Sequence, residues 1–159
     1  MALYLIELTP ATASKDEATA LIETVSNSLS EGAELIETQV SADHKLIFAI
    51  IESENTAFAP TLTAAIGERA SVVGPDEVRL VGAELDDIKK LKKDADYLVE
   101  WDIPAEITME QYLTRKKANA PKYAEVPEVS FLRTYVREDT AKCLCFYDAP
   151  DEDAVLRAR

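Results

Sequence analysis

The apolar and polar positions of the chain follow the same order twice. An apolar run typical of a strand begins each copy, at residues 4–8 and again at residues 97–101. Each run leads to a stretch with apolar residues at helical spacing, and then to two further apolar runs separated by a polar turn. The pattern therefore predicts two βαββ units related by duplication.

Both predicted first helices start at a capping-box spacing. Ser14 lies three residues before Glu17, and Thr108 lies three residues before Gln111. In a capping box the hydroxyl accepts a hydrogen bond from the third helical amide, and the longer polar side chain reaches back to the cap. We therefore expect helices directly after Ser14 and Thr108, the second ending before Pro121.

The first copy continues with a second helix and a fourth strand. We expect the helix over residues 56–66, with Gly67 as its C-terminal cap, and the strand over residues 78–81, with an earlier start near Ser71 left open. The complete order βαββαβ is the ferredoxin-like arrangement, so the predicted fold class is α+β.

The predicted organisation is a ferredoxin-like repeat at residues 1–81, a linker at 82–96 that forms a short helix, and a second repeat at 97–159. The second repeat stops inside its second helix and lacks a fourth strand in this sequence. Sheet edges are normally paired or covered. We therefore expect an omitted C-terminal extension, with another subunit or the first repeat as alternative covers of that edge.

The third strand of each repeat is apolar on both faces. Neither residues 46–51 nor residues 143–147 alternate between apolar and polar, as a strand with one solvated face would. We expect the two sheets to pack face to face, as in dimeric α+β barrels, with a homodimer of the whole chain as the competing cover.

Charge and composition limit the classes of partner that we expect the protein to bind. The 159 residues include 17 Lys and Arg against 30 Asp and Glu, a net charge of −13, which disfavours nucleic acid and anionic membranes. No apolar run approaches the ~20 residues that span a bilayer, no signal peptide is evident, and only two cysteines occur. We expect a cytoplasmic protein whose residues 1–81, with 13 acidic and 4 basic side chains, suit a basic protein partner.

Two pairs of residues are candidate metal ligands. Cys143 and Cys145 share one face of a strand, and thiolates bind nickel or zinc, although two donors are too few for a complete site. The competing interpretation is two buried, small apolar residues. Asp43 and His44 occupy a turn and form a possible weak surface site, against the alternative of a solvated turn.

The most distinctive acidic pair is Glu7 and Glu100, which occupy equivalent positions in the two first strands. If the sheets face each other, the two carboxylates approach in a shared interior, where paired acids bind a cation or act as a base. The competing interpretation places both on outer faces, paired with Arg133 or a lysine. The expected wall residues of such a pocket are Tyr97, Tyr135 and Tyr147.

Four blocks of the second repeat match a family pattern. They are residues 97–100, 103–104 with 107–110, 134–139, and 145–155, the last beginning Cys-Phe-Tyr-Asp-Ala-Pro. On these blocks the C-terminal part resembles a small bacterial family of nickel-binding, ferredoxin-like domains of otherwise unknown function, usually dimeric. The resemblance implies a ferredoxin-like fold, nickel binding and a homodimer, with the N-terminal part as a diverged second copy.

The predicted function is a binding module for a small molecule or a metal ion, nickel or another divalent ion, with no catalytic residue assigned. Neither a Gly-rich phosphate loop nor a Ser-His-Asp set is evident. Two alternatives stay open: a cofactor-independent oxygenase or isomerase with its cavity at Glu7 or Glu100, and a protein-interaction scaffold.

Overall fold

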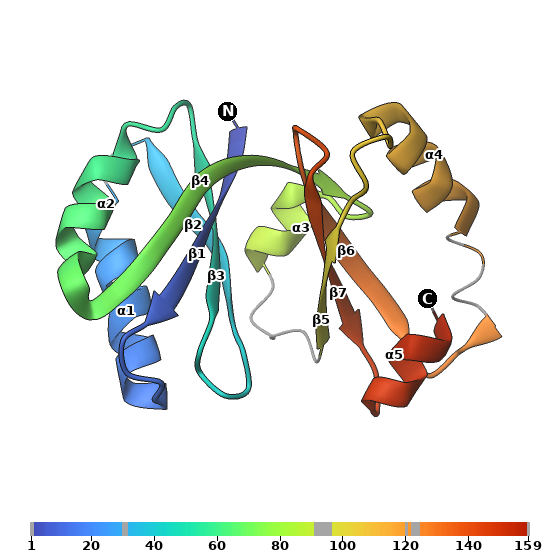
Figure 1. Cartoon of the computed structure of the whole chain (residues 1–159), viewed down its shortest axis with the longest axis horizontal. Helices are drawn as coiled ribbons and strands as arrows, with labels where there is room; N and C mark the ends of the chain where they lie inside the picture. Colours follow the sequence, from blue (N-terminus) through green and yellow to red (C-terminus); the bar gives the residue numbers. More distant parts are fainter. Residues whose placement is uncertain (1, 30–31, 91–96, 120, 122–124, 159) are drawn as a thin grey trace. The chain divides into compact units, whose positions relative to one another are not determined.

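The computed structural model describes residues 2–29, 32–90, 97–119, 121 and 125–158 (Figure 1). The chain divides into two compact units, Met1–Val78 (unit 1) and Arg79–Arg159 (unit 2). Strand β4 runs across the boundary between them. The elements up to β4 are β1 (Ala2–Pro10), α1 (Lys15–Ser28), β2 (Ala33–Val40), β3 (Ile47–Ser53), α2 (Phe58–Ile66), a 3₁₀ turn (Gly67–Arg69) and β4 (Ala70–Val81). Those after β4 are α3 (Leu85–Lys90), β5 (Tyr97–Asp102), α4 (Met109–Asn119), β6 (Ser130–Arg137), β7 (Lys142–Asp148) and α5 (Glu152–Ala158).

Unit 1 is an antiparallel sheet with helices on one face. The strands lie in the order β2-β3-β1-β4, and α1 and α2 both cover the same side of the sheet (Figure 1). This order places the first and third strands at the centre, as in the ferredoxin-like arrangement. The α+β class predicted from the sequence is confirmed.

The core of unit 1 lies between this sheet and its two helices. Alternate residues of β1 point into it, and Ile6 and Leu8 are fully buried there. Leu21 of α1 and Leu62 of α2 meet them from the helix side. Burial of each such side chain stabilises the fold by about 1.5–3 kcal/mol. The apolar spacing along the strand and along the helices therefore determines which side of each element points into the core.

The predicted helix starts are confirmed by their hydrogen bonds. The amide of Glu17 donates to Ser14 Oγ at 3.1 Å. In unit 2 the bonds are reciprocal: the amide of Gln111 donates to Thr108 Oγ1 at 3.2 Å, and the amide of Thr108 donates to Gln111 Oε1 at 3.0 Å. Caps of this kind contribute about 1 kcal/mol each, enough to fix where a short helix begins.

Strand β4 has the earlier of the two starts that the sequence left open. It begins at Ala70, before Gly74-Pro75, and the ladder with β1 absorbs the interruption as a register shift between Leu5 and Glu7. Gly74 has a φ of +104°, and a Cβ there would lie 2.5 Å from the Leu5 carbonyl oxygen. The alternative start near Ser71 is therefore confirmed, and Gly74-Pro75, a pair that usually ends a strand, forms a bulge inside β4.

The strands of unit 2 also pair in antiparallel ladders. The end of β4 is followed in order by β6, β7 and β5, and α4 and α5 cover one face (Figure 1). Strands β6-β7-β5 repeat the order β2-β3-β1 of unit 1, and within the described residues β5 is the edge strand. Helix α3 lies within residues 82–96, whose role as a linker stays a prediction, and residues 91–96 lie outside the described part. Descent of the two units from a duplication stays a prediction.

Both faces of the third strands are buried. In β3 the successive residues Phe48, Ala49 and Ile50 are all buried, and in β7 the same holds for Leu144 and Phe146 together with the cysteines beside them. The missing alternation in the sequence therefore corresponds to burial on both sides. The proposed face-to-face packing of the sheets stays a prediction.

Candidate dithiol site

The two cysteines meet inside unit 2. They lie two positions apart on β7, so both side chains point to the sheet face that packs against α4 and α5. Each is only 1% exposed, and their Sγ atoms are 3.9 Å apart. The predicted shared face is confirmed, and we call Cys143 and Cys145 the thiol pair.

Cys145 has three hydrogen-bond partners that favour a thiolate. Lys116 Nζ on α4 donates to its sulfur at 3.3 Å, and Thr134 Oγ1 on β6 donates at 3.3 Å. The hydrogen bond from Cys143 has the largest effect, and together with Lys116 and Thr134 it lowers the pKa of Cys145 to about 5 against the opposing effect of burial. Cys145 is therefore the anionic member of the pair at neutral pH.

Cys143 keeps the proton. Its hydrogen bond to Cys145 and its burial both raise the pKa of its thiol far above the ordinary value. The pair thus shares one proton and carries one negative charge, with Lys116 as the compensating cation. One side of that cation is in contact with the Phe131 ring, whose centroid lies 4.7 Å from Nζ.

Tyr112 of α4 supplies a polar group with no assigned role. It is 4% exposed, and its hydroxyl makes no hydrogen bond of good geometry within the described structure. Burial raises the pKa of this phenol strongly, and the nearby Cys143 adds to the shift. Because an unsatisfied buried hydroxyl costs about 1–3 kcal/mol, its position beside the thiol pair needs an explanation.

The distance between the two sulfurs distinguishes a disulfide from a metal ion that both sulfurs bind. Residues two apart on a strand have Cβ atoms about 6.6 Å apart, whereas a disulfide needs about 3.8 Å. Metal–sulfur bonds of about 2.3 Å place two sulfurs about 3.8 Å apart at a tetrahedral angle and about 3.3 Å apart at a right angle. The observed 3.9 Å suits a shared metal ion in a tetrahedral or trigonal arrangement.

The charge state of the pair predicts an unusual titration. We expect thiolate absorbance in the ultraviolet to titrate with a midpoint near 5 in the wild type. Lys116→Met should raise that midpoint, because an ammonium donor at 3.3 Å is removed, while Lys117→Met, at an exposed position on the same helix, should leave it unchanged.

Stability should follow the same titration. Since the folded-state pKa of Cys145 is depressed, its contribution is complete above the ordinary thiol pKa of about 8.5 and is lost as the pH falls toward 5. The free energy of unfolding should therefore fall more over this range in the wild type than in Cys145→Ser. Parallel curves for the two proteins, or a midpoint near 8.5 in the wild type, would contradict the assignment.

The other predicted metal ligands, Asp43 and His44, belong to unit 1, whereas the thiol pair belongs to unit 2. Asp43 is exposed in the β2–β3 turn, where its carboxylate accepts bonds from the Ser41 hydroxyl at 2.8 Å and the Lys45 amide at 3.1 Å, which lower its pKa. His44 beside it has a φ of 60°. Across the described residues, no three His, Cys, Asp or Glu side chains gather in a way that could hold a metal ion.

The predicted acidic pair is divided between the units. Glu7 lies on β1 of unit 1, and Glu100 lies on β5 of unit 2, where it forms an ion pair with Lys142. The lysine partner agrees with the outer-face interpretation for Glu100. A shared carboxylate site stays a prediction.

The three tyrosines expected to line a pocket occupy different environments in unit 2. Tyr147 and Tyr135 are buried to within 1% and pack edge to face against Phe131 and Phe146, at centroid distances of 5.7 and 5.6 Å. Tyr97, opposite Tyr147 in the ladder, is half-buried. Contacts of this kind belong to a packed core, so a ligand-binding role for these rings stays a prediction.

Sequence reasoning missed the groups that surround the thiol pair. Lys116, Thr134 and Tyr112 are not among the candidate site residues that the sequence predicted. The available signal is spacing: Tyr112 and Lys116 are four apart and share one helix face. The capping box at Thr108 locates the helix start and hence that face.

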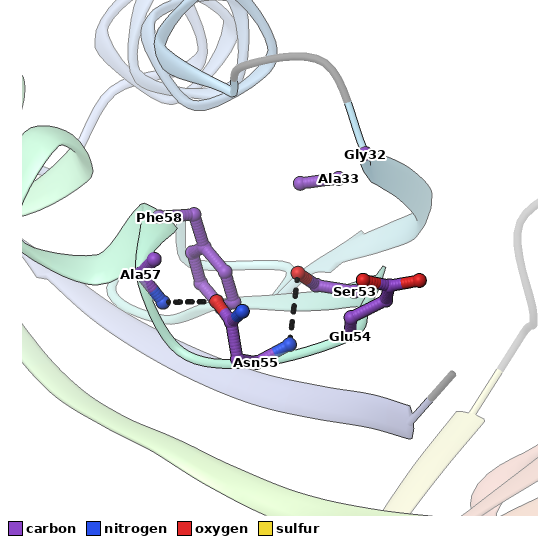
Figure 2. Close-up of a pocket in the computed structure, with 7 residues that line it drawn as sticks. All are labelled: Gly32, Ala33, Ser53, Glu54, Asn55, Ala57 and Phe58. Carbon is purple, nitrogen blue, oxygen red and sulfur yellow. Dashed lines mark hydrogen bonds between the residues drawn. The ribbon is translucent and has the colours of Figure 1, made fainter.

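A separate cavity lies in unit 1 (Figure 2). It has a volume of about 190 Å³ and sits beside the loop between β3 and α2. Asn55 organises the loop: its amide N–H donates to Ser53 Oγ at 3.4 Å, and its side-chain oxygen accepts from the Ala57 amide at 2.9 Å. The lining residues are Gly32, Ala33, Ser53, Glu54, Asn55, Ala57 and Phe58. These hydrogen bonds form a turn just before α2 begins at Phe58.

Comparison with known proteins places the thiol pair in a family-matched region. Residues 97–159 match the family model SCO4226-like, described as nickel responsive protein SCO4226-like. The resemblance predicted for the C-terminal part is thereby confirmed. A search of curated proteins found no match.

The whole chain has a similar solved structure. A crystal structure described as "Putative Chlorite dismutase TA0507" aligns over 99% of this chain and 84% of its own, with a TM-score of 0.56 and 16% sequence identity. At that identity the likeness shows the fold alone.

Within the described residues, no helix is both long and apolar enough to cross a membrane.

Proposed function

We propose, on the premise that residues 97–159 match the nickel-responsive family model, that the protein binds one metal ion through the thiol pair. The observation that carries the proposal is the 3.9 Å separation of the Cys143 and Cys145 sulfurs on one buried face. It supports metal binding because two sulfurs at this distance can share an ion without moving the strand.

The thiolate character of Cys145 supports the same proposal. A metal ion needs deprotonated sulfur, and the bonds from Lys116 and Thr134 already stabilise one thiolate. Lys116 is only partly buried, so Cys145 lies one side chain away from solvent.

Nickel itself fits these residues incompletely. Nickel(II) with thiolates in a square plane needs sulfurs about 3.3 Å apart, and the described part of the chain adds no third His, Cys, Asp or Glu to the pair. We therefore assign the binding to the two sulfurs and leave the family's metal as one ion to be tested among several.

Metal titration tests the proposal. Reduced, metal-free protein should bind one equivalent of a thiophilic ion with a sulfur-to-metal charge-transfer band for nickel(II), or with measurable heat for zinc. The double variant Cys143→Ser, Cys145→Ser should lose at least about 100-fold in affinity, because both donors are replaced by poor ones. Asp43→Asn is the matched control and should leave affinity unchanged. Equal binding by wild type and double variant would remove the proposal.

The remaining interpretations from the sequence stay predictions. An oxygenase or isomerase activity would need a cavity at Glu7 or Glu100, and a scaffold role, a homodimer or a basic protein partner would need an identified surface. The thiol pair favours none of them.

A further inference from the structure

The thiol pair offers an ion two sulfurs and few other donors. In the described residues no third ligand of the usual kinds joins Cys143 and Cys145. Zinc usually takes four ligands, whereas thiolates also select copper(I), which accepts two or three. The donor count therefore favours an ion of low coordination number.

The surroundings restrict water as a substitute ligand. Both cysteines are 1% exposed and belong to an apolar cluster with Val136, Tyr147 and Val155. A divalent ion held by two sulfurs would need room for two waters or for added ligands in that cluster. An ion satisfied by sulfur alone needs neither, and its linear coordination widens the Sγ–Sγ distance from 3.9 Å to about 4.6 Å at bonds of about 2.3 Å.

The local charges favour a monovalent ion. With both sulfurs deprotonated the pair carries two negative charges, and Lys116, which lies 3.3 Å from Cys145, supplies one positive charge. One added positive charge brings the sum to zero, whereas a divalent ion leaves an excess positive charge in an apolar core. Uncompensated buried charge is costly, so neutrality discriminates between the two classes.

The unpartnered Tyr112 hydroxyl gains a role in the same arrangement. In the metal-free protein the hydroxyl beside Cys143 makes no good hydrogen bond. A metal-bound Cys143 sulfur is a thiolate, which can accept from the phenol. Hydrogen bonds of this kind to a ligand commonly change metal affinity 10–100-fold.

We infer that the ion bound by Cys143 and Cys145 is monovalent and thiophilic, of the copper(I) class, with Lys116 as its charge-balancing group and Tyr112 as the donor to the Cys143 sulfur. The inference rests on the proposed function and names its ion. Binding joins the ion to both sulfurs, any thiol proton they hold goes to solvent, and no electron is transferred. Lys116 and Tyr112 are positioning residues, since they act through the sulfurs.

The test compares copper(I) with zinc in the full chain under anaerobic conditions, each ion in competition with a chromophoric chelator. Because every dithiol prefers copper(I), the reference is the same affinity ratio measured for dithiothreitol. The protein should exceed that reference ratio by at least about tenfold. A ratio equal to or below that of dithiothreitol overturns the inference, while zinc or nickel binding that requires the cysteines would still uphold the proposed function.

Two variants test the roles of the neighbouring groups. Lys116→Met should shift the affinity ratio toward zinc by about tenfold, since zinc then reaches neutrality, whereas Lys117→Met should not. Tyr112→Phe should weaken copper(I) binding about tenfold without lowering the stability of the metal-free protein, and Tyr97→Phe should do neither. An unchanged ratio in Lys116→Met, or unchanged copper(I) affinity in Tyr112→Phe, overturns the inference. Loss of binding of every ion by the wild type overturns the proposed function as well.

Discussion

Replacing Tyr147 with alanine is expected to lower the free energy of unfolding of unit 2 by about 3–5 kcal/mol. The ring is fully buried, packs edge to face on Phe131 at 5.7 Å, and lies in the same cluster as the thiol pair. Its removal leaves a cavity that the sheet and helices α4 and α5 cannot readily close, because packed cores relax only partly. Aromatic pairing of this geometry adds about 0.5–1.5 kcal/mol to the loss.

Tyr97→Ala is the matched control for that result. Tyr97 stands opposite Tyr147 in the β5–β7 ladder but is only half-buried, so its removal should cost clearly less. Chemical denaturation of both variants, followed by the fluorescence of Trp101 in the same unit, gives the comparison. Equal losses, or a loss below about 1 kcal/mol for Tyr147→Ala, would contradict the assignment of Tyr147 to the core.

Leu62→Ala should destabilise unit 1 by about 2–5 kcal/mol and leave metal affinity unchanged. Leu62 of α2 is fully buried in the core of unit 1, whereas every group assigned to the thiol pair belongs to unit 2. The cost comes from lost apolar burial and from the cavity left behind.

The measurement combines thermal unfolding with metal titration below the transition. Leu156→Ala, at an exposed apolar position of α5, is the control and should change stability by less than about 0.5 kcal/mol. If Leu62→Ala reduced metal affinity as strongly as loss of a cysteine does, the placement of the whole site in unit 2 would be wrong.

The parts of the fold that depend on local chemistry were predictable. Ser14 and Thr108 begin their helices because a hydroxyl three residues before a suitable partner satisfies a free amide, whatever the rest of the chain does. Gly67 ends α2 with a φ of +59°, which only glycine adopts easily. Such signals act over a few residues and are visible in one sequence.

The extent of β4 was not predictable in the same way. Gly74-Pro75 normally interrupts a strand, and the bulge that accommodates it depends on the pairing of Leu5 and Glu7 in β1. Because those partners lie some 70 residues away along the chain, the local pattern alone gave a strand at residues 78–81 and left a start near Ser71 open.

The shared position of the two cysteines in the candidate site could be predicted from strand periodicity. Alternation along a strand placed Cys143 and Cys145 on one face, and the sulfur spacing of 3.9 Å agrees with this. Lys116 and Thr134 were not foreseen, because their approach to Cys145 depends on how α4 packs and how β6 pairs with β7. Register and helix packing are tertiary properties that residue spacing does not encode.

X-ray absorption at the metal edge of the loaded protein tests the central claim most directly. The thiol-pair account predicts two sulfur scatterers at about 2.3 Å per bound ion and none in Cys143→Ser, Cys145→Ser. A first shell made only of oxygen and nitrogen in the wild type would contradict it.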